Sequence, residues 1–198
     1  MEGTIVDDKL KQMMDDAIWV GKNLFSRGKV SGSAANLSFR YDNKIYITRS
    51  GSCFGRLDID DFSILSLDGT VLNEIKPSKE WPLHLALFQK DQSAEAVIHT
   101  HSTYATYWSC QKWDGLSELI PTPTPYLKMK VGEVGFVPYA PPGTQGLFEA
   151  FENSLKETNC YLLENHGPIL ADKTMLDAFY AIEELEEASK NAYLLKTL

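Results

Sequence analysis

Hydrophobic residues recur at helical spacing near both ends of the chain. Residues 10–25 carry them about one turn apart, and the same spacing returns in the stretch that follows Asp172. A period near 3.6 residues predicts an amphipathic helix, so we expect a helix in each segment, the second one capped by Asp172. The acidic residues of this last helix are expected to form its solvent-exposed face; they are Glu183, Glu184, Glu186 and Glu187.

Three further helices are predicted between these two. Residues 81–88 are almost continuously apolar, and Pro82 is tolerated in the first turn of a helix. The Ser-Thr pair that opens residues 102–110 can cap a second helix, and Thr144 can cap a third, which runs to residue 155.

Short apolar runs bounded by turn residues predict β-strands. Asp42 and Asn43 favour a tight hairpin between two of these runs, and Asp68 and Gly69 favour a second hairpin. The pattern supports strands mixed with helices but does not fix their order in a sheet. The predicted strands are residues 37–41, 44–48, 63–67, 70–74, 96–101 and 134–137, and two short runs within residues 161–171.

Composition narrows the classes of function. The chain has 198 residues, enough for one sizeable core, and we expect a single domain over residues 1–198. No apolar run approaches the ~20 residues of a membrane-spanning helix, and the acidic start does not resemble an export signal, so we expect a cytoplasmic protein without membrane contact. A formal net charge of -8 argues against a nucleic-acid partner but permits a small phosphorylated ligand. The cysteines are widely spaced and are expected to be buried reduced thiols; they are Cys53, Cys110 and Cys160.

Residues 96–102 place two histidines, His99 and His101, at the end of an apolar run. Alternate side chains of a strand share a face, so the two imidazoles could bind one cation. Two histidines can also lie on an ordinary sheet face, so this motif alone leaves metal binding open. His84 stands apart from the pair and is expected to pack or cap locally, and a lone histidine in a turn, such as His166, is more often structural.

Loops of small residues offer candidate anion sites. Residues 28–36 and residues 49–52 combine small side chains with hydroxyl or amide donors, which suit a phosphate or a carboxylate. Ser78 lies near the start of the helix predicted at residues 81–88, where free amides and the helix dipole favour an anion. Glu80 has two interpretations there: an acidic residue that favours a helix start, or a functional carboxylate.

Five short motifs, taken together, resemble the class II aldolase/adducin head family in order and spacing. The likeness covers nearly the whole chain. It implies an α/β fold, a three-layer α/β/α domain around a mixed, largely antiparallel central sheet, assembled as a homotetramer with sites between subunits. The motifs are Ala35-Asn36, Thr48-Arg-Ser-Gly51, Lys76-Pro-Ser-Lys-Glu80, His99-Thr-His101 and Asn165-His166-Gly167.

The resemblance also implies a metal centre and a substrate site. In that family two histidines of a His-x-His motif and the histidine of a His-Gly motif bind a divalent metal, usually zinc, with Mn2+ or Co2+ as alternatives. A glutamate acts as acid or base and contacts the resting metal, and this residue corresponds to Glu80. Ala35 replaces a family glycine and Lys79 replaces a serine, so the phosphate contacts need not be identical. The implied metal ligands are Glu80, His99, His101 and His166, and the implied substrate-binding residues are Ala35, Asn36, Ser50, Gly51, Ser78 and Lys79.

The Lys-Pro-Ser-Lys-Glu motif, residues 50–58 and residues 124–132 resemble the branch that decarboxylates 3-oxo-tetronate 4-phosphates. This implies release of CO2 and formation of dihydroxyacetone phosphate through an enediolate. The alternatives are an aldolase of the fuculose-phosphate type, a methylthioribulose-phosphate dehydratase and a non-enzymatic adducin-like binding domain. In the fuculose-phosphate aldolase a tail beyond the last helix carries a catalytic tyrosine, and we expect no counterpart of that tyrosine here. Tyr126 and Lys130 are candidates for contribution across a subunit interface.

Overall fold

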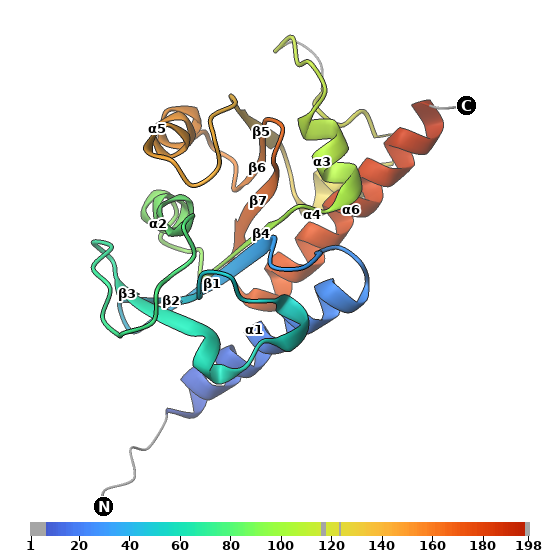
Figure 1. The fold of residues 1–198 in the computed structure, drawn as a ribbon. Helices are drawn as coiled ribbons and strands as arrows, with labels where there is room; N and C mark the ends of the chain where they lie inside the picture. Colours follow the sequence, from blue (N-terminus) through green and yellow to red (C-terminus); the bar gives the residue numbers. More distant parts are fainter. Residues whose placement is uncertain (1–6, 116–117, 123, 197–198) are drawn as a thin grey trace, which may run out of the picture.

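A seven-stranded β-sheet forms the centre of the computed structural model, which describes residues 7–115, 118–122 and 124–196 (Figure 1). Its strand order is β3-β2-β1-β4-β7-β6-β5. Neighbouring strands are antiparallel, apart from β5 and β6, which are parallel. The sheet is therefore mixed and largely antiparallel, as predicted. The strands are β1 (Ala35–Tyr41), β2 (Lys44–Thr48), β3 (Phe62–Ser66), β4 (Ala96–Thr100), β5 (Val134–Val137), β6 (Cys160–Leu163) and β7 (Gly167–Asp172).

Helices cover both faces of this sheet and complete three layers (Figure 1). One face is covered by α1, α3 and α6 around a core that includes Leu37 and Leu185. The other is covered by α2 and α5 around a core that includes Leu87 and Phe151. The helices are α1 (Asp8–Ser26), α2 (Trp81–Lys90), α3 (Thr103–Ser109), α4 (Tyr126–Lys130), α5 (Gln145–Ser154) and α6 (Met175–Lys196), with short 3-10 helices η1 (Phe54–Arg56) and η2 (Ile59–Asp61).

Alternation along β4 sorts its side chains between the two cores. Ala96 and Ile98 pack in the core beneath α1 and α6, whereas Val97 packs in the core beneath α2 and α5. Because side chains two residues apart share a face of a strand, His99 lies on the same face as Val97. The strand therefore directs His99 toward the layer that contains α2.

The predicted strand at residues 70–74 is wrong. The expected turn forms at Gly69, with a φ of 87°, but only an isolated bridge joins Leu65 to Val71. The side chain of Asn73 replaces the backbone pairing that a strand would need. Its Oδ1 accepts from the amide of Ile64 at 3.0 Å, and its Nδ2 donates to the carbonyl of Phe62 at 3.1 Å. Backbone bonds pair Ser66 with Thr70 and Ile64 with Leu72, and beyond them the side-chain amide of Asn73 takes the place of a neighbouring strand.

The start of α6 differs from the prediction. Asp172 ends β7, and the hydroxyl of Thr174 accepts from the amide of Asp177 at 3.0 Å, so Thr174 caps the helix. Glu186 is not solvent-exposed as predicted but 3% exposed. Its carboxylate accepts from the amides of Tyr104 at 3.1 Å and Ala105 at 2.9 Å. Glu186 therefore caps α3, where the side chain of the predicted cap Ser102 makes no cap hydrogen bond.

The three cysteines are free thiols, as predicted, but they are not all buried. Cys160 is buried, and burial raises the pKa of its thiol to about 12. Cys53 is half-buried and Cys110 is exposed. Among the residues that the structure describes, no helix combines the length and the apolar composition needed to cross a membrane.

Candidate active site

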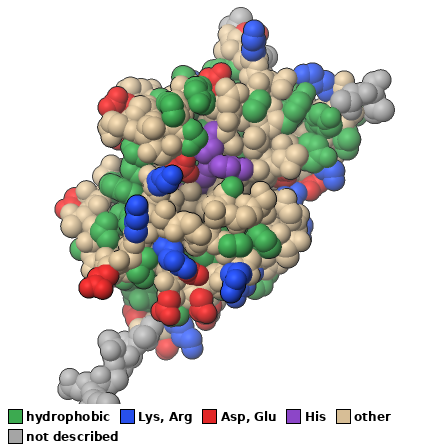
Figure 2. Space-filling model, viewed as in Figure 1, with side chains coloured by type: hydrophobic (Ala, Val, Ile, Leu, Met, Phe, Trp, Pro, Cys, Tyr) green, Lys and Arg blue, Asp and Glu red, His purple; other side chains and the backbone are tan. Residues whose placement is uncertain are grey.

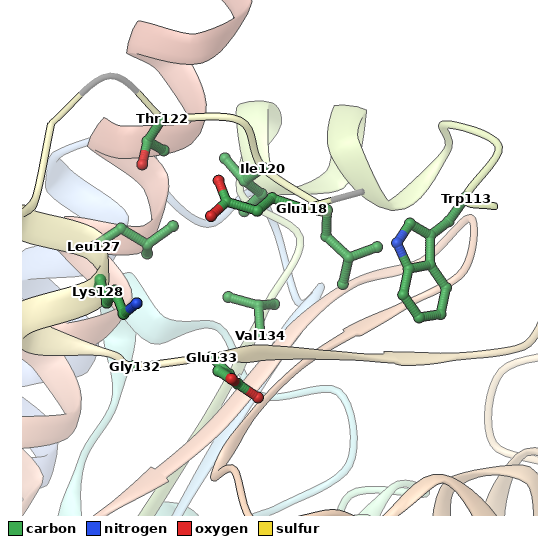
Figure 3. A pocket seen from close by; sticks show the side chains of 10 residues that line it. Trp113, Glu118, Ile120, Thr122, Leu127, Lys128, Gly132, Glu133 and Val134 are labelled. Carbon is green, nitrogen blue, oxygen red and sulfur yellow. The ribbon is translucent and has the colours of Figure 1, made fainter. Parts of the chain in front are cut away.

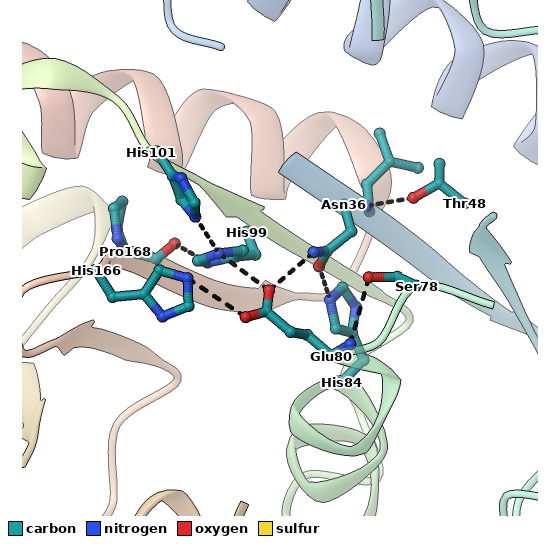
Figure 4. A network of polar contacts seen from close by, with 10 residues as sticks. Asn36, Thr48, Ser78, Glu80, His84, His99, His101, His166 and Pro168 are labelled. Atoms are coloured by element: carbon teal, nitrogen blue, oxygen red, sulfur yellow. Dashed lines mark hydrogen bonds and ion pairs between the residues drawn. The ribbon is translucent and has the colours of Figure 1, made fainter. Parts of the chain in front are cut away.

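Three histidines meet at one end of the sheet, although they come from two distant parts of the sequence (Figure 4). His99 lies on β4, His101 follows the end of that strand, and His166 lies in the turn between β6 and β7. The ring centroids are 4.7–4.9 Å apart. The antiparallel pairing of β4 with β7, which places His99 opposite Ile169, brings the turn against the end of β4.

The turn between β6 and β7 fixes His166 by its backbone conformation. Asn165 has a φ of 56° and Gly167 a φ of 151°, both in regions that L side chains rarely adopt. A Cβ added at Gly167 would lie 2.5 Å from the carbonyl oxygen of Thr100 and 3.3 Å from the Cα of His101. Only glycine allows this close approach, so the Asn-His-Gly motif is a structural requirement for bringing the third imidazole to the other two.

The imidazole nitrogens have the arrangement of a ligand set. His99 Nδ1 donates to the carbonyl of Pro168 at 2.9 Å, which leaves the lone pair of Nε2 directed at the other histidines. His99 Nε2 lies 3.0 Å from His101 Nε2. Ligand nitrogens around a tetrahedral zinc ion are separated by roughly 3.3 Å, because each lies about 2.0–2.1 Å from the metal. One ligand nitrogen from each of the three histidines lies within 4.8 Å of the others, so the cluster could hold a divalent metal.

Burial keeps these imidazoles neutral. It lowers the pKa of His99 well below its ordinary value, and the neighbouring His166 and His101 lower it further. Burial also lowers the pKa of His101 and of His166. Neutral imidazole is the form that binds metals, so the electrostatic environment of the cluster agrees with its geometry.

Glu80 belongs to the histidine cluster and does not serve the helix start. It occupies the N-cap position of α2 but makes no side-chain cap hydrogen bond. Its Oε2 lies 3.3 Å from His99 Nε2, and its Oε1 lies 3.3 Å from His166 Nε2. Asn36 Nδ2 also donates to Oε2 at 3.1 Å. Glu80 therefore does not cap α2 through its side chain, and its carboxylate lies among the histidines.

A cavity of about 350 Å3 opens above this cluster. Figure 2 shows the imidazoles in the hollow at the middle of one face, next to a basic side chain. Every residue predicted for substrate binding lines the cavity. His99 is fully buried and is not among the lining residues. The lining residues are Ser33, Ala34, Ala35, Asn36, Arg49, Ser50, Gly51, Ser78, Lys79, Glu80, His101, Pro142, Gly143 and His166.

Comparison with known proteins identifies the family to which this arrangement belongs. Residues 15–193 match the model of the Class II Aldolase and Adducin N-terminal domain. The chain belongs to the class II aldolase/adducin family. This match covers the sheet, both helical layers and all four residues of the histidine and glutamate cluster.

Relatives within the class II aldolase/adducin family carry two kinds of name. The chain is 37% identical to the 3-oxo-tetronate 4-phosphate decarboxylase of Haemophilus influenzae, over 90% of this chain and 86% of the relative. It is 35% identical to the L-fuculose phosphate aldolase of Methanocaldococcus jannaschii, over 87% of this chain and 91% of the relative. The crystal structure of YgbL from Klebsiella pneumoniae matches with a TM-score of 0.86 and 36% identity, over 93% of this chain and 90% of that one. These likenesses confirm the predicted class II aldolase fold.

Several lining residues of this class II aldolase site were not predicted to bind. Pro142 and Gly143 come from a segment predicted only as a turn, and Gly143 contacts the aliphatic stem of Lys79: an added Cβ would lie 3.2 Å from the Lys79 Cβ. Arg49 belongs to a predicted anion loop but was not singled out. Its Nε pairs with Asp61 Oδ1 at 2.5 Å, a partner twelve residues away that no local pattern indicates.

Two other predicted features lie apart from the cavity. Tyr126 and Lys130 are on α4, and neither lines the histidine cavity; Lys130 pairs with Asp177 at 3.6 Å. A second cavity of about 240 Å3 lies near α4, lined by side chains that include Trp113, Leu127 and Val134 (Figure 3). No histidine is among its described lining residues, so it lacks the chemistry of the first cavity.

Proposed function

We propose that this chain is a divalent-metal-dependent carbon-carbon lyase that releases CO2 from a 3-oxo-tetronate 4-phosphate. The observation that carries the proposal is the convergence of three neutral imidazoles and the Glu80 carboxylate beside a cavity that Arg49 and Lys79 also line. The name of the Haemophilus influenzae relative supports this reaction. A negatively charged sugar-acid phosphate also suits basic residues at the cavity.

We propose that His99, His101 and His166 hold the metal, which we expect to be zinc, with Mn2+ or Co2+ as alternatives. A divalent cation bound there supplies a Lewis acid that polarises the substrate ketone. The imidazoles add no negative charge of their own, because burial keeps them neutral. The Pro168 carbonyl fixes the ring of His99, so this ligand is oriented before any metal binds.

The proposed reaction breaks one carbon-carbon bond and forms one carbon-hydrogen bond. The electron pair of the bond between C1 and C2 moves toward the C3 ketone as CO2 leaves, which gives an enediolate. One proton added at C2 then gives dihydroxyacetone phosphate. We propose that Glu80 takes up a proton from solvent water, passes it to C2 and returns to the carboxylate form, because its carboxyl group lines the cavity within 3.3 Å of two imidazoles.

We propose that the small-residue loops bind the phosphate and that Lys79 binds the carboxylate. The loops offer the hydroxyls of Ser50 and Ser78 and the open backbone of Gly51, where an added Cβ would meet nothing within 4 Å. Arg49 is already paired with Asp61, whereas Lys79 forms no ion pair with a carboxylate among the described residues. Ala35 and Asn36 complete the substrate-facing wall.

Lys79→Met tests the assignment of the two anionic groups. If Lys79 binds the carboxylate, this variant should raise KM for the oxo-acid roughly 10-fold or more, because a charge-assisted hydrogen bond is lost. Inhibition by dihydroxyacetone phosphate, which carries the phosphate but no carboxylate, should stay unchanged. A parallel loss of affinity for both molecules would instead assign Lys79 to the phosphate.

A panel of phosphorylated oxo-acids and ketoses tests the reaction itself. Purified zinc-loaded protein should release CO2 and dihydroxyacetone phosphate in equal amounts from a 3-oxo-tetronate 4-phosphate, with no aldehyde. His99→Ala should lose both the metal and the activity. Failure to release CO2, together with aldehyde release from L-fuculose 1-phosphate, would contradict the decarboxylase proposal and support the aldolase.

The aldolase is the second candidate because the Methanocaldococcus jannaschii relative bears that name at 35% identity. Both reactions use the same metal, the same acid and a negatively charged carbon intermediate. They differ in whether CO2 or an aldehyde leaves. The assignment of His99, His101, His166 and Glu80 therefore does not depend on which candidate is correct.

We also propose that the protein acts as a single-domain, cytoplasmic homotetramer with its sites at subunit interfaces. The exposed side chains of Tyr126 and Met129 on α4 are 60% and 76% exposed, which suits contact with a neighbouring protomer. Light scattering after size-exclusion chromatography would measure the assembly. A stable monomer with full activity would contradict this part of the proposal.

A further inference from the structure

A line of buried polar groups connects the fully buried Ser38 to the carboxylate of Glu80, and Figure 4 shows its part from His84 through Asn36 to Glu80. His84 Nδ1 lies 2.7 Å from Ser38 Oγ, and His84 Nε2 lies 2.5 Å from Asn36 Oδ1. Asn36 Nδ2 in turn donates to Glu80 Oε2 at 3.1 Å. The sequence predicted that His84 packs or caps locally, whereas the structure gives it two specific polar partners on β1.

Two periodicities create this line. Asn36 and Ser38 are two residues apart on β1 and therefore face the same side of the sheet. Glu80 and His84 are four residues apart at the start of α2 and therefore lie on one face of the helix. Because this face of the helix packs on this face of the sheet, the residues along the line come alternately from β1 and from the start of α2.

The hydrogen-bond roles along the line are set by Glu80. A carboxylate only accepts, so Asn36 must present its NH2 group to Glu80 and its carbonyl oxygen to His84. A carbonyl oxygen also only accepts, so His84 Nε2 must carry the proton. In a neutral imidazole the other nitrogen then accepts, and Ser38 donates its hydroxyl proton to Nδ1. Burial lowers the pKa of His84 to about 3, which keeps the ring neutral.

We propose that His84 is a positioning residue for the acid/base group: through Asn36 it holds the Glu80 carboxylate in its reactive orientation. A terminal amide can rotate by 180°, and such a rotation would place the carbonyl oxygen of Asn36 against the carboxylate. The Nε2 proton of His84 prevents this rotation, because only the carbonyl end of the amide can accept it. This inference rests on the proposed role of Glu80, but not on which substrate is used.

Three variants of the zinc-loaded enzyme test the proposal by steady-state kinetics on whichever panel substrate is turned over. His84→Leu removes both polar contacts and should lower kcat about 10- to 100-fold, as expected for loss of a group that orients an active-site residue, while KM and zinc content stay within about twofold. His84→Gln can still donate to Asn36 and should recover most of this loss. Ser38→Ala, a smaller change that preserves the packing, should give an intermediate kcat and covers the case in which His84→Leu does not fold.

An Asn36→Ala background separates positioning from general damage. If His84 acts through Asn36, adding His84→Leu to Asn36→Ala should lower kcat by less than about twofold further. Multiplicative losses would overturn the proposal. In the His84 variants, a rise in KM with unchanged kcat would also overturn it, because His84 would then act through Asn36 on substrate binding and not on Glu80.

The tautomer of His84 provides a readout that needs no substrate. Nitrogen NMR of the 15N-labelled zinc protein near pH 7.5 should show Nε2 protonated and Nδ1 unprotonated. A proton on Nδ1 would overturn the proposal whatever the kinetics show. If no panel substrate is turned over, the proposed function fails, and the NMR result still decides whether His84 holds Asn36 as described.

Discussion

The buried imidazole of His84 makes the folding stability depend on pH. Its side chain is 0% exposed, and burial lowers its pKa in the folded protein to about 3 from its ordinary value of 6.5. Below about pH 6.5 the unfolded chain binds a proton that the folded protein does not. This contribution to stability is therefore fully present above pH 6.5 and is lost as the pH falls from 6.5 toward 3.

The size of the effect follows from proton linkage. Between about pH 8 and pH 5.5 the unfolded state gains roughly one pKa unit of proton-binding free energy at this site, which is about 1.4 kcal/mol. The folded protein gains almost nothing there, because pH 5.5 still lies well above its His84 pKa. The lower pH also stays above the sequence pI of about 5.0, where the net charge vanishes and precipitation is favoured.

His84→Gln isolates this contribution. Glutamine keeps an amide donor for Asn36 but does not titrate, so its stability should fall less with acidification than that of the wild type. Urea unfolding of the metal-free proteins, each measured at both pH values, gives the change in unfolding free energy for each protein. The wild type should lose about 1.4 kcal/mol more than the variant, a difference in which the titration of the other groups cancels. Equal losses in the two proteins would refute the reasoning.

Three further substitutions test other parts of the site. Glu80→Gln should lower turnover roughly 10²- to 10⁴-fold while most of the metal stays bound, and unchanged turnover would refute its acid/base role. Gly167→Ala should reduce zinc content and lower the free energy of unfolding by about 1–3 kcal/mol, because its Cβ would lie 2.5 Å from the carbonyl oxygen of Thr100. Gly32→Ala, also at a positive φ but with nothing within 4 Å of its Cβ, is the comparison variant without a clash and should keep its zinc. Glu186→Gln should cost about 1–3 kcal/mol in urea unfolding by leaving a buried amide of α3 unpaired, against about 0–1 kcal/mol for the half-exposed Glu187→Gln. Equal costs at positions 186 and 187 would contradict the capping role.

The cluster of the three histidines and Glu80 could be predicted because local rules and motif spacing suffice for it. The period of a strand puts His99 and His101 on one side, and the resemblance supplies His166 and Glu80. Periodicity and capping residues also predicted α1, α2, α3, α5, α6 and most strands, but not α4. They failed where a single side chain decides the structure. Asn73 forms hydrogen bonds with the edge of β3 where a strand was predicted, and the hydrophobic pattern does not indicate this contact.

Long-range polar partners were the other failure. The acidic positions of α6 suggested a solvated face, yet Glu186 binds backbone amides more than eighty residues earlier in the chain. For His84, the sequence indicated only that it lies apart from the other histidines along the chain. Its partners on β1 become visible only when α2 packs on the sheet. Such contacts depend on which faces of helices and strands pack together, and the pattern of a single sequence does not predict this packing.

The division between sheet and loops explains how one scaffold could serve two reactions. The histidines are held by β4 and by a turn whose conformation Gly167 dictates, and Glu80 is anchored through Asn36 on the neighbouring β1. Lys79 instead lies on a loop, against Gly143 of a second loop. Relatives named as a decarboxylase and as an aldolase match this chain at 37% and 35% identity, so overall similarity hardly separates the reactions. The choice of leaving group must then depend on a few substrate-facing residues, and Lys79, which replaces a serine of the aldolase motif, is the first position to test.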